Sequence, residues 1–162
     1  MRNKNNIWIS FLGQTIYENL NSFWWFCEEK KSLPNQIVLF HALDKKDECK
    51  VVLDLFDIIY QKYNTNKKLE LLPVVFNEEN ANDFYKKFKK IIIEYVAKRN
   101  ELFIDISPTT WSFIPVYIIK IFENYHNKND RILYIQYTNH NYRKLPYPLI
   151  PRKGIVDHYI NL

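Results

Sequence analysis

Short apolar runs alternate with longer amphipathic segments along most of this chain. Continuous, often β-branched runs predict buried strands, and they cover residues 7–12, 36–42, 69–76, 102–105 and 131–139. Between them, apolar residues recur every three or four positions, which predicts helices over residues 14–31, 48–63, 77–99 and 110–125. Pro73 predicts an irregular start to the third strand, and Pro115 lies where it would kink the last helix.

This alternation of strands and helices requires crossover connections. It predicts an α/β fold, with a Rossmann-like, mostly parallel sheet and helices on both faces. In such sheets ligands bind outside the carboxyl ends of the strands. We therefore expect a binding site at the strand ends, which are residues 12–15, 40–42, 76–78 and 105–109.

The fourth strand ends at an acid and continues through hydroxyl residues and a proline. The segment after Asp105 contains Ser107, Pro108, Thr109 and Thr110. Ser and Thr are ordinary N-cap residues, but unpaired N–H groups and the helix dipole also make a helix N-terminus an anion site. Taken alone, the segment favours the capped helix start over the anion site. It also favours a structural role for the Asp105 carboxylate, which would hold the loop, over a catalytic role.

Composition narrows the function classes. The 162 residues, 47% of them hydrophobic, fit one globular domain, and no apolar run approaches the length of a membrane span. We expect a soluble, cytoplasmic chain, or the cytoplasmic part of a membrane-anchored protein. The net charge of +5 suits an anionic ligand. Two glycines exclude both the G-x-G-x-x-G fingerprint and the Walker P-loop, and the two cysteines lack metal-ligand spacing.

Taken together, the strand ends resemble those of the CARF domain, the CRISPR-associated Rossmann fold of type III CRISPR systems. The segments that carry the resemblance are ISFLGQTIYEN, LPNQIVLFHAL, VVFNEENANDF and FIDISPTTW, with RILYIQY as the fifth strand. They extend over residues 7–140. In the fourth motif Thr109 replaces the usual glycine and Trp111 the usual lysine, a cation that faces the ligand phosphates in many relatives.

The resemblance implies a homodimeric sensor of cyclic oligoadenylate, most often the tetra-adenylate ring, that acts in antiviral defence. Residues 1–140 would form the ligand-sensing domain, and residues 141–162 a C-terminal arm or short strand extension of it. No metal or other cofactor is implied. The output module would lie outside this chain, for example as a membrane helix or a separate effector, and we expect no direct binding of DNA or RNA.

The resemblance also implies which residues bind the ligand. The candidates are Leu12, Gly13, Gln14, Thr15, Asn19, His41, Asn77, Ser107, Pro108, Thr109, Thr110 and Trp111. Helix N-termini after Gly13 and Pro108 would direct N–H groups at phosphates, and Trp111 would stack on an adenine. Asn19 fits a solvent-facing residue equally well, and His41 a structural histidine.

Two other functions remain open. The first is a ring nuclease, a metal-independent phosphodiesterase that aligns a ribose 2′-hydroxyl with its neighbouring phosphate. Ser107 and the Thr109 N–H would then stabilise the developing charge, although the absent motif lysine weakens this alternative. The second is a basic domain that binds nucleic acid through its surface charge.

Overall fold

The computed structural model describes residues 5–30, 33–63, 68–109 and 113–160, which build one six-stranded sheet in the order β3-β2-β1-β4-β5-β6. The strands are β1 (Asn6–Phe11), β2 (Gln36–Ala42), β3 (Glu70–Phe76), β4 (Glu101–Asp105), β5 (Arg131–Tyr137) and β6 (Ile155–Ile160). Neighbours from β3 to β5 pair in parallel, and β6 pairs antiparallel with β5. The predicted Rossmann-like, mostly parallel sheet is confirmed.

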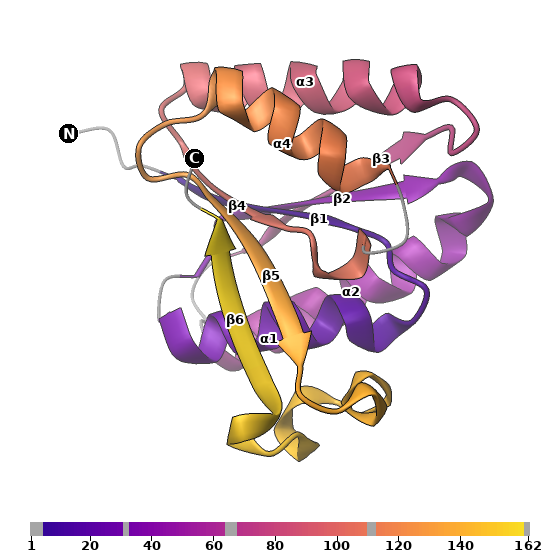
Figure 1. The fold of residues 1–162 in the computed structure, drawn as a ribbon, viewed down its shortest axis with the longest axis vertical. Helices are drawn as coiled ribbons and strands as arrows, with labels where there is room; N and C mark the ends of the chain where they lie inside the picture. The colour runs from indigo at the N-terminus through magenta and orange to yellow at the C-terminus, as the bar shows by residue number, and fades with distance from the viewer. Residues whose placement is uncertain (1–4, 31–32, 64–67, 110–112, 161–162) are drawn as a thin grey trace.

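Helices cover both faces of the sheet (Figure 1). They are α1 (Ile16–Lys30), α2 (Lys46–Tyr63), α3 (Ala81–Ala97) and α4 (Ile114–Tyr125). α3 and α4 lie on one face, and α1 and α2 on the other. Each pair seals its own apolar cluster against the strands. In α3, for example, Phe84, Phe88 and Ile92 lie four positions apart and form a stripe that is buried in the first cluster.

The two prolines that predicted irregularities are accommodated without them. Pro73 lies inside β3, aligned with Leu39 of β2, and β3 is an edge strand, where a missing N–H donor is tolerated. Pro115 lies in the first turn of α4, where its N–H would have no helical partner. α4 therefore starts at Ile114 and not near residue 110, so Pro115 does not kink it.

The C-terminal segment returns to the sheet. After β5 come the 3₁₀ turns η3 (His140–Lys144), η4 (Tyr147–Leu149) and η5 (Arg152–Gly154), followed by β6. The register places Ile155 opposite Tyr137 and Ile160 opposite Ile132. β6 thus begins beside the carboxyl end of β5 and runs antiparallel to it, toward the end of the sheet where the parallel strands begin. Among the described residues, no helix has the length and apolar character needed to cross a membrane.

Candidate functional site

The order of the strands reverses between β1 and β4, and a cavity lies at the carboxyl edge beside this point. In doubly wound sheets this is where ligands bind. The cavity has a volume of about 370 Å³ and gathers residues from the turns after β1, β2, β3 and β4. We call it the strand-end cavity, and its lining is Phe11, Leu12, Gly13, Gln14, Phe40, His41, Ala42, Lys45, Phe76, Glu78, Pro108, Thr109 and Ile114.

The candidate binding residues divide into three groups. Those that line the cavity are Leu12, Gly13, Gln14, His41, Pro108 and Thr109. Those outside its lining are Thr15, Asn19, Asn77 and Ser107. Thr110 and Trp111 lie outside the described residues, so the proposed adenine stacking stays a prediction.

The backbone N–H groups of the turn after β1 are all bonded within the chain. Gly13 N donates to Asn19 Oδ1 at 2.9 Å. Gln14 N and Thr15 N donate to Glu18 Oε2 at 2.8 and 3.3 Å. Thr15 and Glu18 have the spacing of a capping box, in which the acid three residues after the N-cap bonds back to its N–H. The start of α1 is therefore capped by its own carboxylate.

Asn19 is fully buried, which excludes the solvent-facing alternative. Its Nδ2 donates to Phe11 O at 2.7 Å and to Ser10 Oγ at 3.2 Å, while its Oδ1 accepts from Gly13 N. The amide thus ties the end of β1 to the first helix from beneath the cavity, and its polar atoms are already bonded. It shapes the turn that lines the cavity.

A buried carboxylate anchors the other side of the strand-order reversal. Asp105, with no exposed surface, accepts hydrogen bonds from Ser10 Oγ at 3.2 Å, Ser22 Oγ at 2.5 Å and both N and Oγ of Ser107, at 3.0 and 2.5 Å. Burial raises the pKa of this carboxyl to about 6, against the opposing effect of these hydrogen bonds. Ser107 Oγ also accepts from Ile135 N at 2.9 Å. One acid therefore joins β1, α1, β4 and β5, and the loop-holding role accounts for all these contacts.

The turn after β4 does not form the helix N-terminus that the sequence predicts. Ser107–Thr109 is a 3₁₀ turn, in which Thr109 N and Oγ1 both donate to Ile106 O, at 3.0 and 2.8 Å. The next described helix, α4, starts at Ile114. The expectation of helical N–H groups directed at phosphates straight after Pro108 is therefore wrong for the described residues.

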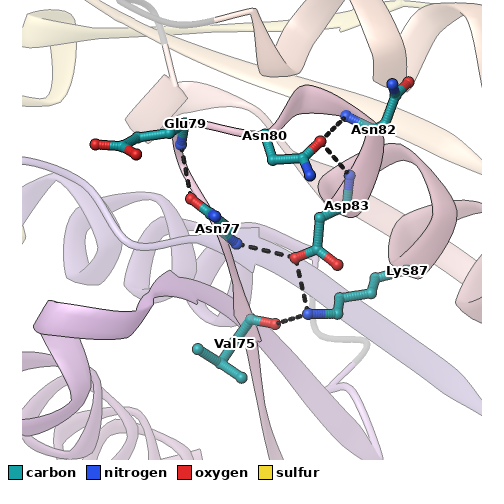
Figure 2. A network of polar contacts seen from close by, with 7 residues as sticks. All are labelled: Val75, Asn77, Glu79, Asn80, Asn82, Asp83 and Lys87. Atoms are coloured by element: carbon teal, nitrogen blue, oxygen red, sulfur yellow. Dashed lines mark hydrogen bonds and ion pairs between the residues drawn. The ribbon is translucent and has the colours of Figure 1, made fainter.

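At the turn after β3, Asn77 holds the backbone (Figure 2). Its Oδ1 accepts from Glu79 N at 2.9 Å, and its own N donates to Asp83 Oδ2 at 3.0 Å. Lys87 bonds the same carboxylate oxygen at 2.8 Å and Val75 O at 3.0 Å. This set of contacts orients the chain so that the next residue along, Glu78, lines the strand-end cavity.

The turn after β2 is different because it brings a cation to the cavity. His41 Nδ1 lies 2.7 Å from Ala42 O. A carbonyl can only accept, so the Nδ1 proton is fixed and Nε2 is the acceptor of the neutral ring. Four residues on, Lys45 lines the cavity from the 3₁₀ turn η1 (Leu43–Lys45). The sequence predicts only a connection at this segment. The signal that could have found Lys45 is its position three residues after the end of β2.

Two other cavities lie away from the strand-order reversal. A cavity of about 490 Å³ between α1 and the C-terminal segment is lined by Trp24, Tyr147 and other residues, but Lys62 Nζ already lies 5.2 Å from the centre of the Trp24 ring. A groove of about 480 Å³ beside β3 has a mostly apolar lining that includes Lys46 and Lys50. Neither is at the strand-order reversal. Within the described part of the chain, no cluster of His, Cys, Asp and Glu side chains could hold a metal ion.

Comparison with known proteins supports the interpretation of the fold. No family model matches the sequence, and no curated protein matches it. Among solved structures, the fold matches Enterococcus italicus Csm6 bound to cyclic hexa-2′-fluoro-hexa-dAMP, with a TM-score of 0.62 at 15% identity over 99% of this chain. At this identity the likeness is one of fold alone, and it agrees with the Rossmann-like, mostly parallel sheet of this chain. This chain spans 43% of the length of that Csm6 chain.

Proposed function

We propose that this chain is a CARF domain that binds cyclic oligoadenylate, in particular the tetra-adenylate ring, as the homodimeric sensor of a type III CRISPR antiviral system. It would pass the binding event to an output module outside residues 1–162. The observation that carries the proposal is the strand-end cavity, at the strand-order reversal of a fold shared with a Csm6 that was solved with a cyclic adenylate analogue.

The shape of the cavity supports a shared, cyclic ligand. At about 370 Å³ it is at the lower end of small-molecule pockets, which hold roughly 300–1,000 Å³. A ring of several nucleotides exceeds that volume. Two copies related by a two-fold axis would present two identical cavities to a ring with the same symmetry. Phe11, Phe40 and Phe76 are buried in the core at the base of the cavity, so the groups offered to a ligand come mainly from the turns around them.

The hydrogen bonds favour binding over cleavage. A ring nuclease would need free donors near the developing charge. The donors that the sequence offered for this role, Ser107 Oγ and Thr109 N, are bonded to Asp105 and Ile106 O. We therefore expect the ring to be bound and left intact.

The test is a binding and cleavage assay with cyclic tetra-adenylate, cyclic hexa-adenylate and linear tetra-adenylate. Calorimetry would give the affinities, chromatography after several hours would show whether the ring survives, and light scattering would give the oligomeric state. We expect tight binding of a cyclic ligand by a dimer, with the ring intact. Linear products would establish the nuclease, while binding of duplex DNA with a steep salt dependence and no ring binding would establish the nucleic-acid alternative.

A matched pair of variants tests the location of the site. Gln14→Glu adds a carboxylate to an exposed position that lines the strand-end cavity, and Gln136→Glu makes the same change at an exposed position on β5. We expect the first to weaken binding of the cyclic ligand at least about tenfold, roughly 1.4 kcal/mol, and the second to leave it unchanged. Equal affinities in the two variants would place the ligand elsewhere.

A further inference from the structure

The strand-end cavity has few charged groups with which to meet phosphates. Of the described residues that line it, Lys45 is the one lysine or arginine, and Glu78 is the one carboxylate. A ligand with several phosphates needs either cations or unpaired N–H donors. The group that would supply positive charge to the ligand phosphates in this cavity therefore has to be identified.

The N-terminus of α1 does not supply that charge. Glu18 Oε2 accepts the N–H groups of both Gln14 and Thr15, and the Gly13 N–H is bonded to Asn19. The negative carboxylate neutralises the positive end of the helix dipole at the place where a phosphate would have to lie. At the side of the cavity next to α1, the N–H groups of Gly13, Gln14 and Thr15 are consequently not available to an anion.

The turn after β2 has the opposite character. Lys45 pairs with Glu48 across 3.2 Å, and both side chains are about half exposed, at 46% and 57%. An exposed pair of this kind contributes about 0–1 kcal/mol, so exchanging the carboxylate for a phosphate costs little. His41, near the end of β2, also lines the cavity, and its Nδ1 is held by Ala42 O.

We infer that Lys45 is the phosphate-contacting residue of the strand-end cavity and takes the place of the helix N-terminus that Glu18 closes. The inference rests on the proposed function and adds to it the residue that determines preference for a phosphorylated ligand. It also assigns a direction to the ligand: phosphates lie toward η1 and away from the start of α1. Glu48 acts as a competitor that leaves Lys45 when the ligand binds.

Neighbouring lysines provide the matched control. Lys45→Gln removes the proposed phosphate contact, whereas Lys46→Gln removes the same charge one residue later, on a side chain that lines the groove beside β3 and not the strand-end cavity. We expect Lys45→Gln to weaken binding of cyclic tetra-adenylate at least about tenfold and to lower the salt dependence of the affinity by roughly 0.7 per lost contact. We expect Lys46→Gln to bind within about twofold of the unaltered protein, a difference of roughly 0.4 kcal/mol.

A second variant is expected to change the ligand affinity in the opposite direction. Glu48→Gln removes the competing carboxylate and is expected to tighten binding by about two- to fivefold, which matches the small energy of an exposed pair. Equal losses in Lys45→Gln and Lys46→Gln, or weaker binding by Glu48→Gln, would overturn the inference while leaving the proposed function intact.

An independent measurement distinguishes failure of the proposed function from failure of the inference about Lys45. If the unaltered protein binds no cyclic oligoadenylate, the proposed function fails, and inorganic tripolyphosphate then serves as the probe. Acetylation of lysine amines, followed by mass spectrometry, should show tripolyphosphate protecting Lys45 more than Lys46. Equal labelling of the two lysines would reject Lys45 as the anion contact whatever the natural ligand is.

Discussion

Two turns on either side of β1 line the same cavity and differ in what they do with their polar groups. In the turn after β4, Asp105 and Ser107 are bonded to one another and to three other elements, and the acid is fully buried. In the turn after β2, Lys45 is half exposed and held by a single weak pair. Polar residues at a strand end can thus serve stability or recognition, and burial tells the two apart.

The largest expected difference between the two turns is in stability. Asp105→Ala leaves buried hydroxyl and N–H donors without their acceptor, and we expect it to lower the free energy of unfolding by about 2–4 kcal/mol. Lys45→Gln should change it by less than about 0.5 kcal/mol. Thermal denaturation should show a midpoint lowered by roughly 5–15 °C in the first variant and nearly unchanged in the second. Similar midpoints would mean that the hydrogen bonds around Asp105 contribute little.

A pH series sharpens the same contrast. The pKa of Asp105 is raised from 3.8 to about 6 in the folded protein, so the folded state binds its proton more tightly than the unfolded state. Its contribution is therefore most favourable below pH 4 and is lost as the pH rises through 6, with a total of roughly 3 kcal/mol.

The measurement for this pH effect is a comparison of two proteins. Asp105→Asn cannot titrate, so the stability of the unaltered protein relative to this variant should fall between pH 4 and 7. Other carboxylates also contribute to the pH dependence: the pKa of Asp83 is lowered, chiefly by its hydrogen bond with Lys87, while burial raises the pKa of Asp130. Taking the difference between the two proteins cancels them. A flat difference would mean that Asp105 titrates normally.

The third prediction concerns the contact between the turns after β1 and β4. A Cβ added at Gly13 would lie 2.6 Å from Glu18 Oε2 and 3.0 Å from Pro108 Cβ. We expect Gly13→Ala to cost about 1–3 kcal/mol and to weaken ligand binding, because it displaces the cap and narrows the cavity. Gly154→Ala is the control, since its Cβ would meet Ile150 and Tyr142 at similar distances, and none of these three residues lines the cavity. It should destabilise the fold and leave ligand affinity unchanged.

The smallest expected effect is at the turn after β3. Asn80 caps α3 by accepting from the N–H groups of Asn82 and Asp83, on an exposed surface. Asn80→Ala should lower the free energy of unfolding by about 1 kcal/mol. Asn82→Ala, in the first turn of the same helix, keeps the cap and should cost less. Urea denaturation of both variants would measure the difference, and an equal loss would contradict the capping role.

The sequence was sufficient for the architecture because apolar periodicity records which faces are buried. β2 was predicted with the bounds that the structure has, since its residues are apolar and end where the chain leaves the sheet. The start of α4 was misplaced because Ser107 and Thr109 have the side chains of an N-cap but use them within a 3₁₀ turn. The position of this turn also depends on contacts with residues distant in sequence, since Ile135 N donates to Ser107 Oγ and Ser10 and Ser22 donate to Asp105, and local pattern does not encode these contacts.

The candidate site was predicted less completely than the fold, for a related reason. Strand ends are visible in sequence, which is why Gly13 and His41 could be assigned to them, and both residues line the cavity. Whether an N–H or O–H donor is free or already bonded within the chain cannot be determined from the sequence. That Glu18 closes the helix terminus was detectable from its capping-box spacing to Thr15, whereas the approach of Lys45 to the cavity requires knowing that β2 and β1 are neighbours.

The reversed direction of β6 has a practical consequence for work at a biosensor surface. Ile160 lies opposite Ile132, near the beginning of β5, while the strand-end cavity opens at the other edge of the sheet. An affinity handle placed after β6 would therefore hold the molecule by its far side. Ligand in the flow would reach the cavity without passing the anchoring matrix, so immobilised protein should report the same affinity as protein free in solution.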